Sequence, residues 1–253
     1  MLLLVDIGNT NITIGYAEGK TISATCRVKT SDSGESDACA VTLSAFIHDN
    51  QLPKPAGAAL CSVVPGVTPA MGDAIIKNFG IEPLVVSSRI KTGLTFSITN
   101  PDGLGADRIA NAAAAHALYG GNVLVIDFGT ATTFCVITEQ GEYKGGVIMP
   151  GPGMSVEALA EKTAKLPRVT LAQPKRVLGD NTTDHITSGV IFGQAGAVDR
   201  ITAEIEREIQ AKLAVIATGG YAERIIPFIR VDHVNPNLTL DGLRVLFELN
   251  SEI

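Results

Sequence analysis

Two short segments of the sequence place a carboxylate, a glycine and a hydroxyl within a few residues of one another. They are Asp6-Ile7-Gly8-Asn9-Thr10 and Asp127-Phe128-Gly129-Thr130. Because glycine has no Cβ, a phosphate can approach its backbone closely, and the short polar side chains beside it supply donors. The carboxylate would repel phosphate directly, so a hydrated Mg²⁺ between the two is the favoured arrangement. The pattern predicts two turns that hold the phosphates of a nucleotide.

The alternative for each segment is an ordinary tight hairpin with Asp and Thr as turn residues. A repeat favours the phosphate-binding interpretation. Shifting the chain by 121 residues lays Val5-Asp6-Ile7-Gly8 over Ile126-Asp127-Phe128-Gly129, and Thr10 and Thr130 then differ by one place. The same order of strand, turn, strand and strand follows on both sides, which indicates an internal duplication.

A third segment, Gly105-Ala106-Asp107-Arg108, opens an alanine-rich helix. Asp at a helix start is favoured electrostatically and as a cap, so a purely structural role is one interpretation. The other is catalytic, because an aspartate that accepts the proton of the attacking hydroxyl recurs in phosphoryl-transfer sites. On this interpretation Asp107 is the general base and Arg108 binds the anionic end of the substrate.

Other nucleotide motifs are weaker. Gly219-Gly220 lies between an expected strand and an expected helix, where it either lets an adenosine approach the backbone or simply turns the chain. The sequence contains no G-x-x-x-x-G-K-[ST] and no G-x-G-x-x-G after a strand. The four histidines are scattered without ligand spacing, so we expect no metal-binding or catalytic histidine.

Hydrophobic spacing predicts the elements that must position these groups, in an α/β fold. Expected strands cover 2–6, 11–17, 21–28, 58–64, 84–87, 122–127, 133–138, 143–149, 213–218 and 231–234. Expected helices cover 37–48, 69–79, 105–119, 155–165, 183–212 and 241–249, with one more between 218 and 231 and a loop over 95–103. Asp6 and Asp127 then end buried strands, at the sheet edge where ligands of α/β proteins gather.

Composition excludes several classes of protein. The 253 residues are 45% hydrophobic and 18% charged, enough for packed cores, and the net charge of −6 disfavours binding to nucleic acid or anionic membranes. The sequence has no tryptophan, so platforms on which single-stranded nucleic acid could stack are scarce. It has no apolar run of about 18 residues, so we expect no transmembrane helix. Its four cysteines form no C-x-x-C pair, which favours scattered buried thiols and a cytoplasmic location.

Six motifs carry a resemblance along the whole chain: Asp6-Ile7-Gly8-Asn9-Thr10, Asn100-Pro101 before Gly105-Ala106-Asp107-Arg108, Asp127-Phe128-Gly129-Thr130-Ala131-Thr132, Gly146 through Gly153-Met154, Asn181-Thr182, and Ala217-Thr218-Gly219-Gly220. In order and spacing they resemble the type III pantothenate kinases of the acetate and sugar kinase/Hsp70/actin superfamily. The resemblance implies two duplicated ribonuclease-H-like domains, 1–119 and 120–253, of mixed sheets flanked by helices, with the active site between them.

The resemblance also implies a reaction and a set of residues. The reaction is ATP-dependent phosphorylation of the primary hydroxyl of pantothenate to 4′-phosphopantothenate, the first step of coenzyme A synthesis. The implied ATP-binding residues are Asp6, Ile7, Gly8, Asn9, Thr10, Asn11, Ile12, Thr13 and Thr130. The implied pantothenate-binding residues are Ile98, Gly105, Ala106, Asp107, Arg108 and Thr182, with Asp107 as base.

Cations and a partner subunit belong to the same expectation. Asp127 would ligate the monovalent cation, K⁺ or NH₄⁺, and Asp6 would hold the Mg²⁺ of ATP through water. The resemblance implies a homodimer in which Thr182 reaches pantothenate from the partner subunit and the helix over 183–212 is the candidate interface.

One position departs from the family. Many relatives carry a tyrosine seven residues before Gly105, where this chain has Ile98, so one substrate hydrogen bond worth about 1 kcal/mol is lost. Two other functions remain open on the sequence. A non-catalytic nucleotide-gated or regulatory protein would bind ATP without phosphorylating pantothenate. A kinase of another small hydroxylated acid is distinguished from a pantothenate kinase only by the family resemblance.

Overall fold

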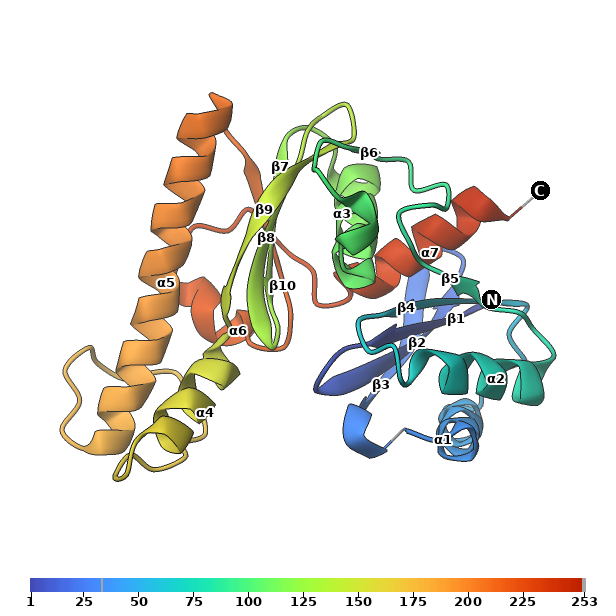
Figure 1. Cartoon of the computed structure of the whole chain (residues 1–253), viewed down its shortest axis with the longest axis horizontal. Helices are drawn as coiled ribbons and strands as arrows, with labels where there is room; N and C mark the ends of the chain where they lie inside the picture. The colour runs from blue at the N-terminus through green and yellow to red at the C-terminus, as the bar shows by residue number, and fades with distance from the viewer. Residues whose placement is uncertain (33, 252–253) are drawn as a thin grey trace. The chain divides into compact units, whose positions relative to one another are not determined.

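The computed structural model describes residues 1–32 and 34–251 (Figure 1). The chain forms two compact units. Unit 1 comprises Met1–Leu118, Gly141–Tyr143 and Asn237–Ile253, and unit 2 comprises Tyr119–Gln140 and Lys144–Pro236. Within the described ranges, no helix is long and apolar enough to cross a membrane.

Unit 1 is built on a five-stranded mixed sheet in the order β3-β2-β1-β4-β5. Its strands are β1 (Leu2–Ile7), β2 (Asn11–Glu18), β3 (Thr21–Lys29), β4 (Gly57–Ser62) and β5 (Leu84–Val85). Strand β1 is antiparallel to β2 and parallel to β4. The apolar run Leu3-Leu4-Val5 is fully buried, as expected for a central strand covered on both faces.

Helices cover both faces of this sheet. On one face, α1 (Ser36–Asp49) and α2 (Thr68–Phe79) pack with Leu3, Val5 and Ile7 of β1. On the other, α3 (Ala106–Tyr119) and α7 (Leu238–Asn250) pack with Leu4 and with Cys61 of β4. The alternation of Leu3, Leu4 and Val5 between the two cores follows from the two-residue period of a strand.

Unit 2 repeats this sheet. Its strands are β7 (Val123–Phe128), β8 (Ala131–Ile137), β9 (Glu142–Pro150), β10 (Ala214–Thr218) and β11 (His233–Val234). They lie in the order β11-β10-β7-β8-β9, which is the order of unit 1 when β7 replaces β1, β8 replaces β2 and so on. The short strand β6 (Thr95–Phe96) pairs with Glu142 and Tyr143, the part of β9 that belongs to unit 1.

The helices of unit 2 are α4 (Pro152–Lys162), α5 (Thr182–Ile209) and the short α6 (Ala222–Ile225). Helix α5 places Ile191, Ala195 and Val198 in one core with the β7, β8 and β10 strands. Three 3-10 turns complete the described chain: η1 (Thr30–Asp32), η2 (Pro101–Gly103) and η3 (Ile226–Phe228).

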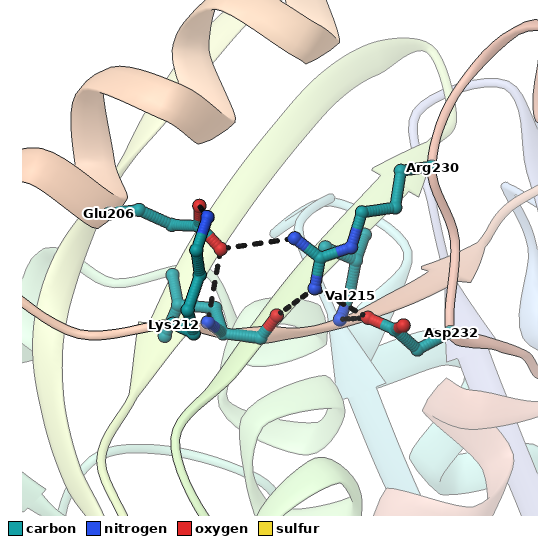
Figure 2. A network of polar contacts seen from close by, with 6 residues as sticks. Glu206, Lys212, Val215, Arg230 and Asp232 are labelled. Carbon is teal, nitrogen blue, oxygen red and sulfur yellow. Dashed lines mark hydrogen bonds and ion pairs between the residues drawn. The ribbon is translucent and has the colours of Figure 1, made fainter.

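A polar network ties the end of α5 to β10 (Figure 2). Glu206 accepts from Lys212 Nζ at 2.6 Å, from Arg230 at 3.2 Å and from the Leu213 amide at 3.2 Å. Arg230 also contacts Asp232, whose carboxylate accepts from the Val215 amide at 2.8 Å. Burial alone would raise the pKa of Glu206, but these donors outweigh it and lower the pKa. The network holds the start of β10, whose other end leads to Gly219-Gly220.

The expected elements match the structure except at several boundaries. The expected loop over 95–103 contains β6 and η2. The final helix begins at Leu238 and not at 241, and α4 begins at Pro152, because proline fits the first turn of a helix. Helix α5 ends at Ile209 because Gln210 adopts a left-handed conformation, with φ 54°.

The predicted domain division, 1–119 and 120–253, describes the two duplicated halves of the chain and stays a prediction. The packed units differ from this division at three points, since Gly141–Tyr143 and Asn237–Ile253 join unit 1 and Tyr119 joins unit 2. The physical reason at the C-terminus is the apolar face of α7, where Leu240, Leu243 and Leu246 complete a core of unit 1.

Candidate active site

Asp6 lies at the end of β1, opposite Cys61 of the parallel strand β4. The Cys61 thiol donates a hydrogen bond to Asp6 Oδ1 at 3.2 Å. Burial raises the pKa of Cys61 well above its ordinary value, and the charges of Asp6 and then Asp107 raise it further. The thiol is therefore a neutral donor that orients Asp6. Its pKa is raised by both predicted functional carboxylates of unit 1, Asp6 and Asp107.

Asp107 lies in the first turn of α3, near the positive end of the helix dipole. Its carboxylate accepts from the Arg108 amide at 2.8 Å. Burial raises the pKa of Asp107, and the amide hydrogen bond and the charge of Arg108 offset part of that increase. A carboxylate in this environment is a stronger proton acceptor than an ordinary exposed aspartate, which suits a general base.

The segment after β4 links the Asp107 segment to the first turn. The Val63 amide donates to the Ile7 carbonyl at 3.0 Å. A Cβ added to Gly105 would lie 3.5 Å from the Val63 side chain and 2.5 Å from Asp107 Oδ1. Gly105 is thus a close neighbour of the Asp107 carboxylate, and the absence of its Cβ leaves room for that side chain.

Arg108 contacts a tyrosine that the sequence did not single out. Its guanidinium donates to Tyr143 Oη at 2.7 Å, and its Cζ atom lies 5.9 Å from the centroid of the tyrosine ring. Tyr143 is fully buried. The predicted substrate-binding arginine is therefore held by a side chain 35 residues further along the chain.

The two Asp-Gly turns have the same construction with one difference in length. In the first, Ile7 pairs with Ile12, and the Gly8 amide donates to the Asn11 carbonyl at 3.0 Å. In the second, Phe128 pairs with Thr132, and the Gly129 amide donates to the Ala131 carbonyl at 3.1 Å. The first turn is one residue longer, which explains the one-place offset between the two threonines.

Side chains of the first turn divide into two groups. Ile7 and Ile12 are fully buried, so only their backbone can face a nucleotide. Asn9 and Thr10 are exposed, and Gly8, Asn11 and Thr13 are half-buried. The turn is braced by Thr30, whose hydroxyl donates to the Gly8 carbonyl at 2.7 Å and whose amide donates to the Thr10 carbonyl at 3.1 Å.

In unit 2, Asp127 ends β7 against the turn that follows β10. Gly219 has φ 95°, and a Cβ there would collide with Asp127 Oδ1 and lie 2.6 Å from the backbone of Phe128. The Tyr221 amide donates to the Phe128 carbonyl at 3.0 Å. The structure thus brings the two predicted nucleotide features of this unit, the second Asp turn and the glycine pair, into contact.

The second turn is also anchored to α4 and α5. The Gly151 amide donates to the carbonyl of the exposed Thr130 at 3.1 Å. Behind it, the Thr132 hydroxyl donates to Gln194 Oε1 at 2.9 Å, and Gln194 Nε2 donates to the Pro150 carbonyl at 2.8 Å. Thr132 and Gln194 are buried, so this satisfied network fixes the turn rigidly.

The remaining predicted positions are Thr182, Ile98 and Ala106. Thr182 is exposed at the start of α5, directly after Asn181, which caps the helix by accepting from the Asp184 amide at 3.0 Å. Ile98 is half-buried and follows β6 by two residues. Ala106 is buried, so it offers a substrate only backbone.

Three positions were missed by sequence reasoning: Cys61, Thr30 and Tyr143. The sequence analysis placed Cys61 only among scattered thiols; none of the four cysteines forms a disulfide, and three of them are buried. Their partners lie 55, 22 and 35 residues away along the chain. No local spacing signals such contacts, since they depend on strand order.

The predicted cation sites offer few oxygen donors from side chains. Among the described residues, no group of three or more His, Cys, Asp or Glu side chains could hold a metal. Asp6 and Asp127 each offer a single carboxylate. This fits Mg²⁺ that keeps its waters and shares phosphate oxygens, and it fits a weakly held monovalent cation that also takes backbone carbonyls.

Comparisons with known proteins identify the family of the chain. The family model described as type III pantothenate kinase matches residues 2–204. A type III pantothenate kinase of Moorella thermoacetica (strain ATCC 39073 / JCM 9320) is 42% identical over 254 residues, which cover 99% of this chain and 100% of the relative.

Solved structures support the fold. The ethanolamine utilization protein EutJ from Carboxydothermus hydrogenoformans has a TM-score of 0.56 at 17% identity, covering 96% of this chain and 89% of that one. The activator of the 2-hydroxyisocaproyl-CoA dehydratase from Clostridium difficile, with bound ADPNP, has a TM-score of 0.52 at 10% identity, covering 98% and 95%. At these identities the likeness concerns the fold alone.

Proposed function

The chain belongs to the type III pantothenate kinase family and is an ATP-dependent pantothenate kinase of coenzyme A biosynthesis, and we propose that Asp107 is the general base of its reaction. The observation that carries this assignment is the half-buried Asp107 carboxylate in the first turn of α3, which accepts from the Arg108 amide at 2.8 Å and whose pKa is raised by burial.

In the proposed reaction Asp107 accepts the proton of the primary hydroxyl of pantothenate. The hydroxyl oxygen then forms a bond to the γ-phosphorus of ATP as the bond from that phosphorus to the β,γ-bridging oxygen breaks. The products are 4′-phosphopantothenate and ADP, and the proton leaves from Asp107 to solvent. Because little covalent chemistry falls to the protein, positioning and charge stabilisation supply most of the rate.

The first turn is proposed to hold the phosphates of ATP. Its exposed Asn9 and Thr10 and the backbone of residues 6–13 supply the donors. Asp6, oriented by the Cys61 thiol at 3.2 Å, would hold a hydrated Mg²⁺. The cation would supply positive charge against the phosphate oxygens, while Asp6 and Cys61 only fix where it is held.

The second turn is proposed to serve the monovalent cation and the nucleotide. Asp127 would ligate K⁺ or NH₄⁺, and the exposed Thr130 would contact ATP. The rigid surroundings of this turn support the assignment: Gly219 packs without a Cβ against Asp127, and the buried Gln194 links β8 to Pro150. Ion sites need such fixed oxygen positions.

Pantothenate is proposed to contact Gly105, Ala106, Arg108 and Ile98, with Arg108 pairing with its carboxylate. Thr182, exposed at the start of α5, is proposed to complete the pocket from the partner subunit of a homodimer. Apolar side chains that a partner could cover occur on the same unit: Val177 is 61% exposed and Leu178 82% exposed. The proposed location is the cytoplasm, where unpaired thiols stay reduced.

The assay for these assignments is ADP release with pantothenate, measured with and without K⁺ and over a range of K⁺ concentrations. Wild type should require pantothenate and a monovalent cation. Asp127→Asn should need a higher K⁺ concentration for half-maximal rate, whereas Asp180→Asn, an exposed aspartate of the same unit, should not. An unchanged K⁺ requirement in Asp127→Asn would remove Asp127 from the cation site.

A further inference from the structure

We propose that Tyr143 is a positioning residue that fixes the guanidinium of Arg108 for the carboxylate of pantothenate. This role rests on the proposed assignment of Arg108 to that carboxylate. Tyr143 itself touches no substrate, because it is fully buried. It acts through Arg108, and it therefore controls the affinity for the anionic substrate and not the proton transfer at the other end of the molecule.

The hydroxyl of Tyr143 makes the decisive contact. Arg108 donates to it at 2.7 Å, a short distance for a hydrogen bond from a charged nitrogen. The ring contributes less, since Arg108 Cζ lies 5.9 Å from its centroid, near the outer limit for a cation–π interaction.

Tyr143 is well suited to hold Arg108 in place because it is itself immobilised. It pairs with Phe96 of β6, and its carbonyl accepts from the Ser97 amide at 3.0 Å. The rings of Phe96 and Tyr143 lie 6.0 Å apart, centroid to centroid, in a tilted arrangement. With the backbone paired and the ring enclosed, the hydroxyl has a fixed position in unit 1.

An arginine side chain loses considerable rotamer freedom when it binds a ligand. The Tyr143 bond removes part of that freedom before the substrate arrives, which strengthens binding through preorganisation. Arg108 also follows Asp107 directly, and its charge lowers the pKa of that carboxyl. The experiment must therefore separate an effect on carboxylate binding from an effect on the base.

The experiment compares Tyr143→Phe with wild type on two substrates, pantothenate and pantothenyl alcohol. The alcohol has CH₂OH in place of the carboxylate and keeps the hydroxyl that is phosphorylated. Tyr143→Phe should raise KM for pantothenate roughly 5- to 30-fold, less than losing a direct hydrogen bond between a charged group and the substrate, because Tyr143 acts through Arg108. Its kcat should stay within about twofold of wild type, and KM for the alcohol should be unchanged.

The matched control is Tyr16→Phe. Tyr16 is also a fully buried tyrosine of unit 1, and its hydroxyl donates to the Pro53 carbonyl at 2.7 Å and not to Arg108. It should lower Tm about as much as Tyr143→Phe does, with both KM values unchanged. Both changes remove one oxygen from an enclosed ring, so both variants should fold.

Two results with Tyr143→Phe would overturn the proposal. One is a Tyr143→Phe enzyme whose KM for pantothenate stays within twofold of wild type, and the other is an equal rise in KM for the acid and the alcohol. Arg108→Met tests the assignment of Arg108 separately. It should abolish the preference for the acid, which is the lower KM that wild type should have for pantothenate than for pantothenyl alcohol. If Arg108→Met abolishes that preference and Tyr143→Phe leaves it intact, the role of Tyr143 fails while that of Arg108 stands. If Arg108→Met keeps the preference, the assignment of Arg108 fails, and the role of Tyr143 fails with it.

Discussion

Replacing Gly105 with alanine should displace the proposed base without straining the backbone. Gly105 is not among the glycines with positive φ, so its main chain tolerates a side chain. The new Cβ would lie 2.5 Å from Asp107 Oδ1. Ordinary van der Waals contact requires the carboxylate to retreat by about 1 Å, and a displacement of that size in a catalytic group can cost on the order of 100-fold in rate.

Steady-state kinetics with both substrates, together with Tm, measures this effect. We expect kcat to fall by roughly 30- to 100-fold while Tm changes by only a few degrees, since the clash is with a side chain and not with backbone. Gly66→Ala is the matched control, because a Cβ at Gly66 meets nothing within 4 Å. If Gly105→Ala instead raises KM for pantothenate with kcat intact, the methyl group blocks the substrate and does not move the base. A kcat within threefold of wild type would refute the reasoning.

Three further predictions concern pH and stability. Because burial raises the pKa of Asp107, kcat/KM should fall as the pH drops below that raised pKa. The fall should begin at a higher pH than it would for a general base with the pKa of an exposed aspartate, and a pH–rate profile measures it. Gly219→Ala, with φ 95° and a Cβ 2.6 Å from Phe128 backbone atoms, should lower the free energy of unfolding by about 2–5 kcal/mol and raise KM for ATP, as measured by denaturant unfolding and kinetics. Glu206→Gln should cost about 1–3 kcal/mol at neutral pH. Because the folded-state pKa of Glu206 lies below its ordinary 4.5, its stabilisation is present above that pH and is lost as pH falls, so wild type and variant should converge in acid unfolding.

The duplicated architecture could be predicted because it rests on local patterns. A buried strand ending in Asp and followed by Gly occurs twice, and both copies form the central strand of a sheet with the same strand order. The one-place offset between Thr10 and Thr130 was visible in the sequence, and the pairing of Ile7 with Ile12 against Phe128 with Thr132 gives its cause.

The contacts that hold the site could not be predicted from local spacing. Cys61 meets Asp6 because β4 inserts beside β1, and Tyr143 meets Arg108 because β9 begins beside β6. Both depend on pairing between strands distant in sequence. The C-terminal helix likewise gives no local sign that Gly242 packs directly on the backbone of Ala110 in α3.

Turnover of Asp107→Asn tests the central claim most directly. Asparagine keeps the shape of the side chain and cannot accept the proton, so kcat should fall by roughly 10²- to 10⁴-fold. ATP affinity, measured by calorimetry, should stay near that of wild type. The free energy of unfolding at neutral pH should rise, because the raised pKa of Asp107 means that its ionised form destabilises the fold as pH increases past 3.8. A folded Asp107→Asn enzyme that turns over pantothenate at a near-normal rate would contradict the account.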